Sequence, residues 1–116
     1  MVTINGKEYP TLARYSAIKM FCDKKGLDFF EFPNLLMDYG IGKEDFKPTS
    51  QFIDDMSLLM WCFLQRGAEV NHQILDLSVN DILDWFMDGN VAVVYDLITE
   101  SQGISKNVSA TEEKGS

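Results

Sequence analysis

The sequence is poor in the residues from which catalytic and metal sites are most often built. It has a single histidine, His72, and two cysteines, Cys22 and Cys62, that stand far apart without a CxxC spacing. This leaves a zinc site and a histidine-dependent triad unsupported, and we expect both cysteines to be reduced core residues. The GxxxxGK[ST] and GxGxxG phosphate patterns and the DxDxDG calcium pattern are also missing. We therefore expect a protein that is not an enzyme and that has no cofactor and no metal site.

Long hydrophobic runs are lacking too. No apolar stretch approaches the roughly 20 residues that span a bilayer, and the first ten residues have no signal-peptide hydrophobic region. The length of 116 residues and the hydrophobic fraction of 46% are those of one ordinary globular domain. We expect a cytoplasmic protein without a membrane partner.

Basic residues are missing from the second half of the chain. Residues 1–66 hold eight basic and nine acidic side chains, a charge of −1, whereas residues 67–105 hold seven acids and no Lys or Arg, a charge of −7. Residues 106–116 are balanced, which gives the total of −8. A region of one sign repels nucleic acid and anionic lipid and favours a basic partner, although acids also simply keep small proteins soluble. We expect no binding of nucleic acid.

The longest apolar stretch, residues 49–67, predicts a central helix. Pro48 blocks extension backwards, Thr49 or Ser50 can cap the first turn, and Arg66 and Gly67 are typical of a helix end. One broad stripe of this helix is suited to a core: Phe52, Ile53, Met56, Leu59, Met60, Phe63 and Leu64.

Two large residues of the same helix do not fit that stripe. Leu58 and Trp61 fall on the opposite side, beside Asp54 and Gln65, so the helix is apolar on nearly all sides. Such a helix is either wrapped by other helices or covered by a second molecule.

The N-terminal third predicts a hairpin and two helices. Val2 to Tyr9 reads as two short strands around Asn5-Gly6, the dipeptide best suited to a type I′ turn. Thr11 can cap a helix that ends at Gly26, and a shorter helix, begun or kinked at Pro33, ends at Gly40. The inward positions of the first helix are expected to be Leu12, Tyr15, Ile18, Phe21 and Cys22.

The C-terminal third predicts two more helices. Ser78 and Asp81 form a capping box for a helix from Val79 to about Asp88, Gly89 ends it, and Asn90 caps the last helix. The inward residues are expected to be Val79, Ile82, Leu83, Phe86 and Met87, then Val91, Val94, Tyr95, Leu97 and Ile98. The fold class is therefore mainly α (small α+β), a short hairpin followed by a bundle of four to five helices. We expect one domain over residues 1–103 and a polar, flexible tail over residues 104–116.

Acids and aromatic residues on the expected surface indicate a binding patch. Asp81, Asp84 and Asp88 share one helix side, where a solvated face is a better interpretation than a Mg²⁺ or acid–base site. Trp85 borders this row, and aromatic anchors bordered by charge are typical of interfaces. The cluster Phe29, Phe30 and Phe32 adds to the apolar surface. The candidate partner-binding residues are Leu58, Trp61, Asp81, Asp84, Trp85 and Asp88.

The order of these elements resembles the tail assembly chaperones of long-tailed bacteriophages. The matching stretches are INGKEYP, CDKKGLDFFEF, DDMSLLMWCFLQRG and LSVNDILDWF, within roughly residues 2–100 and with residues 35–48 unmatched. The resemblance implies a non-enzymatic protein that holds the tape-measure protein soluble and helps recruit tail-tube proteins in the host cytoplasm, without staying in the virion. It also implies a longer, frameshifted form in some members. The alternative from charge alone is a small acidic module that antagonises a basic, nucleic-acid-binding host protein. Self-association stays open.

Overall fold

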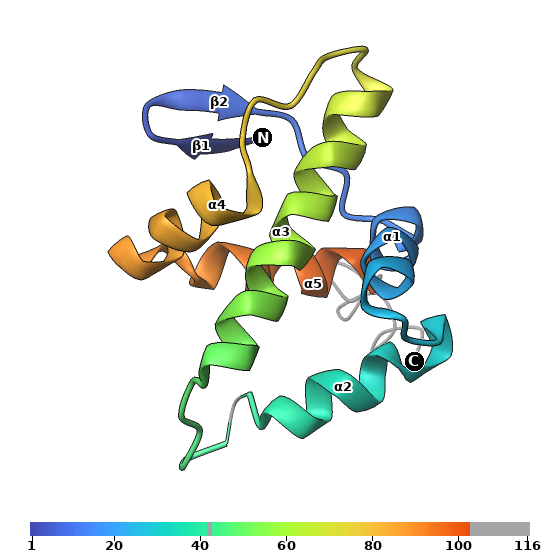
Figure 1. Cartoon of the computed structure of the whole chain (residues 1–116), viewed down its shortest axis with the longest axis vertical. Coiled ribbons are helices and arrows are strands. Elements are labelled where there is room, and N and C mark those ends of the chain that lie inside the picture. Colours follow the sequence, from blue (N-terminus) through green and yellow to red (C-terminus); the bar gives the residue numbers. More distant parts are fainter. Residues whose placement is uncertain (42, 103–116) are drawn as a thin grey trace, which may run out of the picture.

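A long helix, α3 (Ser50–Val70), runs through the middle of the molecule, and the other elements pack around it (Figure 1). The computed structural model describes residues 1–41 and 43–102. The remaining elements are β1 (Val2–Ile4), β2 (Lys7–Tyr9), α1 (Tyr15–Lys25), η1 (Phe29–Glu31), α2 (Phe32–Tyr39), α4 (Val79–Trp85), η2 (Phe86–Asn90) and α5 (Ala92–Ser101). The expected fold class, a hairpin followed by a helical bundle around a central helix, is confirmed. The expected tail, residues 104–116, lies outside the described residues.

The N-terminal hairpin has the predicted turn. Asn5 and Gly6 both take positive φ values, 54° and 85°, and β1 pairs antiparallel with β2 so that Val2 faces Tyr9. Ile4 and Tyr9 are buried, which attaches this small sheet to the helices because two three-residue strands are not stable alone.

Helix α1 begins later than predicted. Thr11 does not cap it; residues 10–13 instead run extended past α3, where the Leu12 N–H donates to the Phe63 carbonyl at 3.0 Å. The helix starts at Tyr15, and the Tyr15 side chain is exposed rather than inward. Its end at Gly26, with φ 71°, is as predicted.

The start and the end of helix α2 agree with the prediction from the sequence. Pro33 stands in its first turn, and Gly40, with φ 78°, ends it.

Helix α3 has the predicted start and a different end. The Thr49 hydroxyl accepts from the Phe52 N–H at 3.1 Å, but the helix continues through Gly67 to Val70. A Cβ at residue 67 would lie 2.3 Å from the Pro10 carbonyl oxygen, so the glycine permits close backbone approach instead of ending the helix. The turn comes after Asn71, whose side-chain amide donates to the Gly67 carbonyl at 2.7 Å.

The C-terminal third departs from the predicted helix faces. The capping box of Ser78 and Asp81 is present, but α4 ends at Trp85 and the chain then makes a wide turn, η2, with Gly89 at φ 107°. Met87, in this turn, is 67% exposed instead of inward. Asn90 is not the cap of α5; its amide donates to the Trp85 carbonyl at 2.8 Å.

The core is continuous from the hairpin to α5. Cys22 and Cys62 are buried in it as free thiols, as predicted. Burial raises the pKa of Cys62 to about 12. Within the described ranges, no helix has the length and apolar character to cross a membrane.

Candidate partner-binding surface

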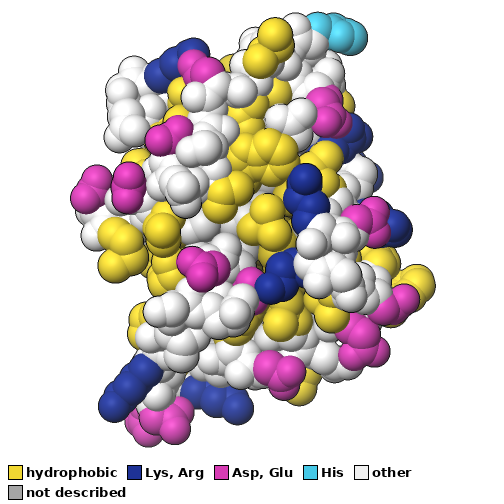
Figure 2. All heavy atoms as spheres, viewed as in Figure 1, with side chains coloured by type: hydrophobic (Ala, Val, Ile, Leu, Met, Phe, Trp, Pro, Cys, Tyr) yellow, Lys and Arg dark blue, Asp and Glu magenta, His cyan; other side chains and the backbone are white. Residues whose placement is uncertain are grey.

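One side of α3 remains open to solvent. Figure 2 shows hydrophobic side chains gathered over α3, between α4 and α1. Leu58 and Trp61 are partly exposed there, on the side of the helix where Asp54 and Gln65 also lie. We call Asp54, Leu58, Trp61 and Gln65 the open face of α3. The position predicted for Leu58 and Trp61, away from the core stripe, is the one that the other helices leave partly uncovered.

Trp61 is held in a defined orientation on this face. Its indole Nε1 donates to the Leu77 carbonyl at 3.0 Å, and the Lys24 Nζ lies 5.2 Å from the ring centroid, within cation–π range. The indole therefore connects α1 with the segment that precedes α4, and it offers a fixed apolar surface to a partner.

Trp85 does not lie on the surface. It is only 6% exposed and packs beside Phe86, with the ring centroids 5.6 Å apart. The expectation that Trp85 borders the acidic row on the outside is thus corrected. Trp85 and the adjacent Phe86 are both buried in the core. The buried side of this segment therefore includes Trp85 and not Met87.

The three candidate acids differ in their surroundings. The Asp81 carboxylate accepts from the Ser78 N–H at 2.9 Å and so serves the capping box. Asp84 and Asp88 are exposed, and neither forms a salt bridge in the part of the chain that the structure describes. These two carboxylates are the ones free to meet a basic partner.

Two other acids of the second half are paired with basic residues of the first. Asp76 accepts from Lys7 Nζ and from the Tyr9 hydroxyl, each at 2.8 Å, and the hydrogen bond from Lys7 lowers the pKa of Asp76. Glu69 pairs with Arg66; its hydrogen bond from Gln65, followed by the one from Arg66, lowers the pKa of Glu69. The acidic region without paired charges is therefore shorter than residues 67–105, and it begins with α4.

An open groove lies between the start of α3 and the α4–η2 segment. We call it the α3–α4 groove. Its volume is about 600 Å³, and its walls come from α3 on one side and from α4, η2 and Val91 on the other. The lining residues are Pro48, Thr49, Ser50, Ile53, Asp54, Leu83, Phe86, Met87 and Val91. Sequence reasoning missed this groove because helical spacing assigned Leu83 and Met87 to the core.

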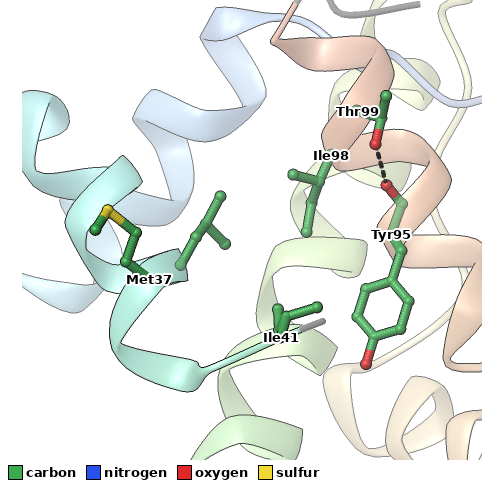
Figure 3. A pocket seen from close by; sticks show the side chains of 6 residues that line it. Met37, Ile41, Tyr95, Ile98 and Thr99 are labelled. Atoms are coloured by element: carbon green, nitrogen blue, oxygen red, sulfur yellow. Dashed lines mark hydrogen bonds between the residues drawn. The ribbon is translucent and has the colours of Figure 1, made fainter. Parts of the chain in front are cut away.

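A second groove separates α2 from α5. Figure 3 shows Met37 and Ile41 on the α2 side and Tyr95, Ile98 and Thr99 on α5. Its volume is about 320 Å³, and Met37, 70% exposed, stands at its edge.

The predicted aromatic cluster divides between core and surface. Phe32 is buried against Phe21, edge to face at 5.8 Å, whereas Phe29 is partly exposed and Phe30 is exposed. Phe29 and Phe30 contact each other edge to face at 5.3 Å. They border a small groove of about 100 Å³ with Tyr15.

A buried carboxylate that the sequence did not single out joins three helices. Asp55 is 3% exposed; its Oδ2 accepts from the Tyr39 hydroxyl at 2.6 Å, and its Oδ1 lies 2.8 Å from Gln51 Nε2 and 2.6 Å from Lys25 Nζ. Burial, followed by this hydrogen bond, raises the pKa of Tyr39 well above its ordinary range. Because both oxygens of Asp55 are occupied, the group ties α1, α2 and α3 together and is not arranged for acid–base work.

The described residues contain no group of three or more His, Cys, Asp or Glu side chains that could hold a metal ion. Comparisons with protein-family models, with curated proteins and with solved structures gave no match. The resemblance to phage tail assembly chaperones therefore stays a prediction.

Proposed function

We propose that this protein is a non-enzymatic phage tail assembly chaperone. It binds the tape-measure protein in the host cytoplasm, keeps that protein soluble and helps recruit tail-tube subunits. The observation that supports this proposal is the open face of α3, where Leu58 and an oriented Trp61 remain partly exposed on the central helix of the fold.

The physical requirements of such a chaperone agree with this surface. A long helical client exposes apolar faces that aggregate in water, and contact with Leu58 and Trp61 would remove part of that apolar area from water. The exposed carboxylates of Asp84 and Asp88 keep the complex charged, which opposes its precipitation.

Co-expression with a tape-measure protein from the same phage tests the proposal. We expect the tape-measure protein in the soluble fraction with the wild-type chain, and several-fold less of it with Leu58→Glu. Ile74→Glu is the matched control, because Ile74 is 95% exposed and lies outside the open face. Circular dichroism of both variants verifies that they fold. A tape-measure protein that is equally soluble without this chain contradicts the proposal.

The acidic-antagonist alternative rests on the unpaired Asp84 and Asp88. The dependence of binding on salt concentration distinguishes the two functions. Binding by charge mimicry weakens steeply as ionic strength rises, whereas capture by an apolar face loses little affinity. Binding to a basic, nucleic-acid-binding protein that is lost between about 50 and about 300 mM salt would favour the alternative.

A further inference from the structure

We infer that the α3–α4 groove is the docking site for an amphipathic helix of a partner protein, one that carries Lys or Arg beside its apolar face. This inference deepens the proposed function, on which it rests for the partner being a protein. The groove shares only Asp54 with the open face of α3, and the inference assigns a defined chemistry to the partner.

The groove has an apolar floor that nothing in the described fold covers. Ile53 comes from α3, Leu83 from α4, Met87 from η2, and Val91 from the residue that precedes α5. Met87 is 67% exposed, and the other three side chains are only partly buried. Helix-in-groove recognition uses such a row, because apolar residues one turn apart on a partner helix can each contact one wall.

The shape of the groove is fixed by the buried side chains behind it. Ile82 and Phe86 lie in the core, and the Asn90 amide holds the wide turn to the Trp85 carbonyl. Gly89, with φ 107°, permits the turn that leaves Met87 outside. The walls are therefore preformed, which lowers the entropic cost of binding.

The charges around the groove select a basic partner. Asp54 is the one charged residue among the described lining residues, and the exposed Asp84 and Asp88 directly follow Leu83 and Met87 in the chain. Lys47, which directly precedes Pro48, is a basic residue beside the lining, whereas residues 67–102 contribute no Lys or Arg, so the acids around the groove outnumber it. A second copy of this chain would bring its own acids, at a net charge of −8, against the same carboxylates, so a basic helix fits better.

Methionine methyl resonances can test this site directly. The chain has six methionines. Met87 and Met37 are exposed to nearly the same degree, 67% and 70%, in different grooves. The full chain with ¹³C-methyl methionine is titrated with a synthetic helical peptide made of Leu and Lys at amphipathic spacing. A peptide of the same length with Glu in place of Lys is the charge control.

We expect the Lys peptide to shift the Met87 signal, to leave Met37 unchanged, and to bind at least tenfold more tightly than the Glu peptide. With a fluorescent Lys peptide, Met87→Glu should weaken binding at least tenfold, and Met37→Glu should not. Replacing both Asp54 and Asp88 by Asn should weaken binding several-fold and reduce its salt dependence.

Three results would overturn the inference. They are equal shifts of Met37 and Met87, equal binding of the two peptides, and a Met87 signal that moves with protein concentration alone, which would identify a second copy as the occupant. None of these measurements involves the tape-measure protein. If this chain failed to solubilise the tape-measure protein but bound the Lys peptide at Met87, the proposed function would be wrong and the site would stand. If it solubilised the tape-measure protein but did not bind the peptide at Met87, only the site would be wrong.

Discussion

The first three helices and the last two are attached to the molecule in different ways. Polar contacts cross between α1, α2 and α3: Asp55 joins Lys25 and Tyr39, and the Arg66 guanidinium donates to the Ser16 hydroxyl at 3.1 Å. Within the described part of residues 79–102, every side-chain hydrogen bond stays inside residues 78–102, as in the capping box or the Thr99 bond to the Tyr95 carbonyl. Helices α4 and α5 therefore rest on the core through apolar packing.

This difference explains why, among the described residues, the surface acids of the last two helices form no salt bridge. The Asp55 carboxylate takes part in such polar contacts, whereas Asp84 and Asp88 lie in the segment attached by apolar packing and form no salt bridge with any described residue. The part of the fold that contributes least to the polar framework is thus the part best suited to meet a charged partner.

The largest effect should come from the apolar attachment of α4. Ile82 is fully buried, and Ile82→Ala leaves a cavity that should lower the free energy of unfolding by about 3 to 4 kcal/mol. Asp84→Ala, two residues away and exposed, should change it by no more than about 0.5 kcal/mol. Urea unfolding of both variants measures the contrast. Equal effects would mean that α4 is not held by its apolar side.

Gly67→Ala tests the backbone approach in the first half. Alanine in place of glycine inside an exposed helix usually adds stability, but here the new methyl group would meet the Pro10 carbonyl at 2.3 Å. We expect the free energy of unfolding to fall by about 3 kcal/mol, which is the upper end of the cost of adding a methyl group to a packed site. Thermal unfolding followed by circular dichroism measures it. An increase in stability would show that the chain at Pro10 does not lie against α3.

Gly67 also shows where sequence reasoning succeeded and where it could not. Local signals were sufficient for the hairpin turn at Asn5-Gly6, the Thr49 cap and the capping box at Ser78, since each depends on neighbours within a few residues. The local sequence at Gly67 is typical of a helix end, which is why the prediction placed the end there. The role that the structure shows, close approach to Pro10, depends on a residue that is distant in sequence.

The candidate surface was predictable to a similar extent. The off-stripe position of Leu58 and Trp61 follows from helical spacing alone, and the structure places both side chains at the surface. Trp85 and Met87 exchanged places because Ile82, Trp85 and Phe86, three and four residues apart, form the buried side of this segment, and Met87 falls outside it. The role of Asp55 required partners from two other helices, which no local pattern reports.

Asp55→Ala tests the polar framework itself. Removing this buried carboxylate leaves the Tyr39 hydroxyl unpaired, while Lys25 can reach water, so we expect a loss of about 2 kcal/mol. The neighbouring Asp54→Ala is the control, because Asp54 is exposed and its removal should cost no more than about 0.5 kcal/mol. Chemical unfolding at pH 7 compares the two. Similar values would remove the distinction between the two carboxylates.

The smallest effect concerns the one ion pair that connects the hairpin with the segment before α4. Hydrogen bonds from Lys7 and then Tyr9 lower the pKa of Asp76 in the folded state. Its contribution to stability is therefore complete above the unfolded pKa, about 4, and is lost as pH falls through the lower folded pKa. Asp76→Asn should show a shallower loss of stability with acid than the wild type, measured by thermal unfolding between pH 5 and about 2. Asp96→Asn, an exposed acid of α5, should follow the wild-type curve. If the Asp76→Asn curve also ran parallel to the wild type, Lys7 would not hold this carboxylate.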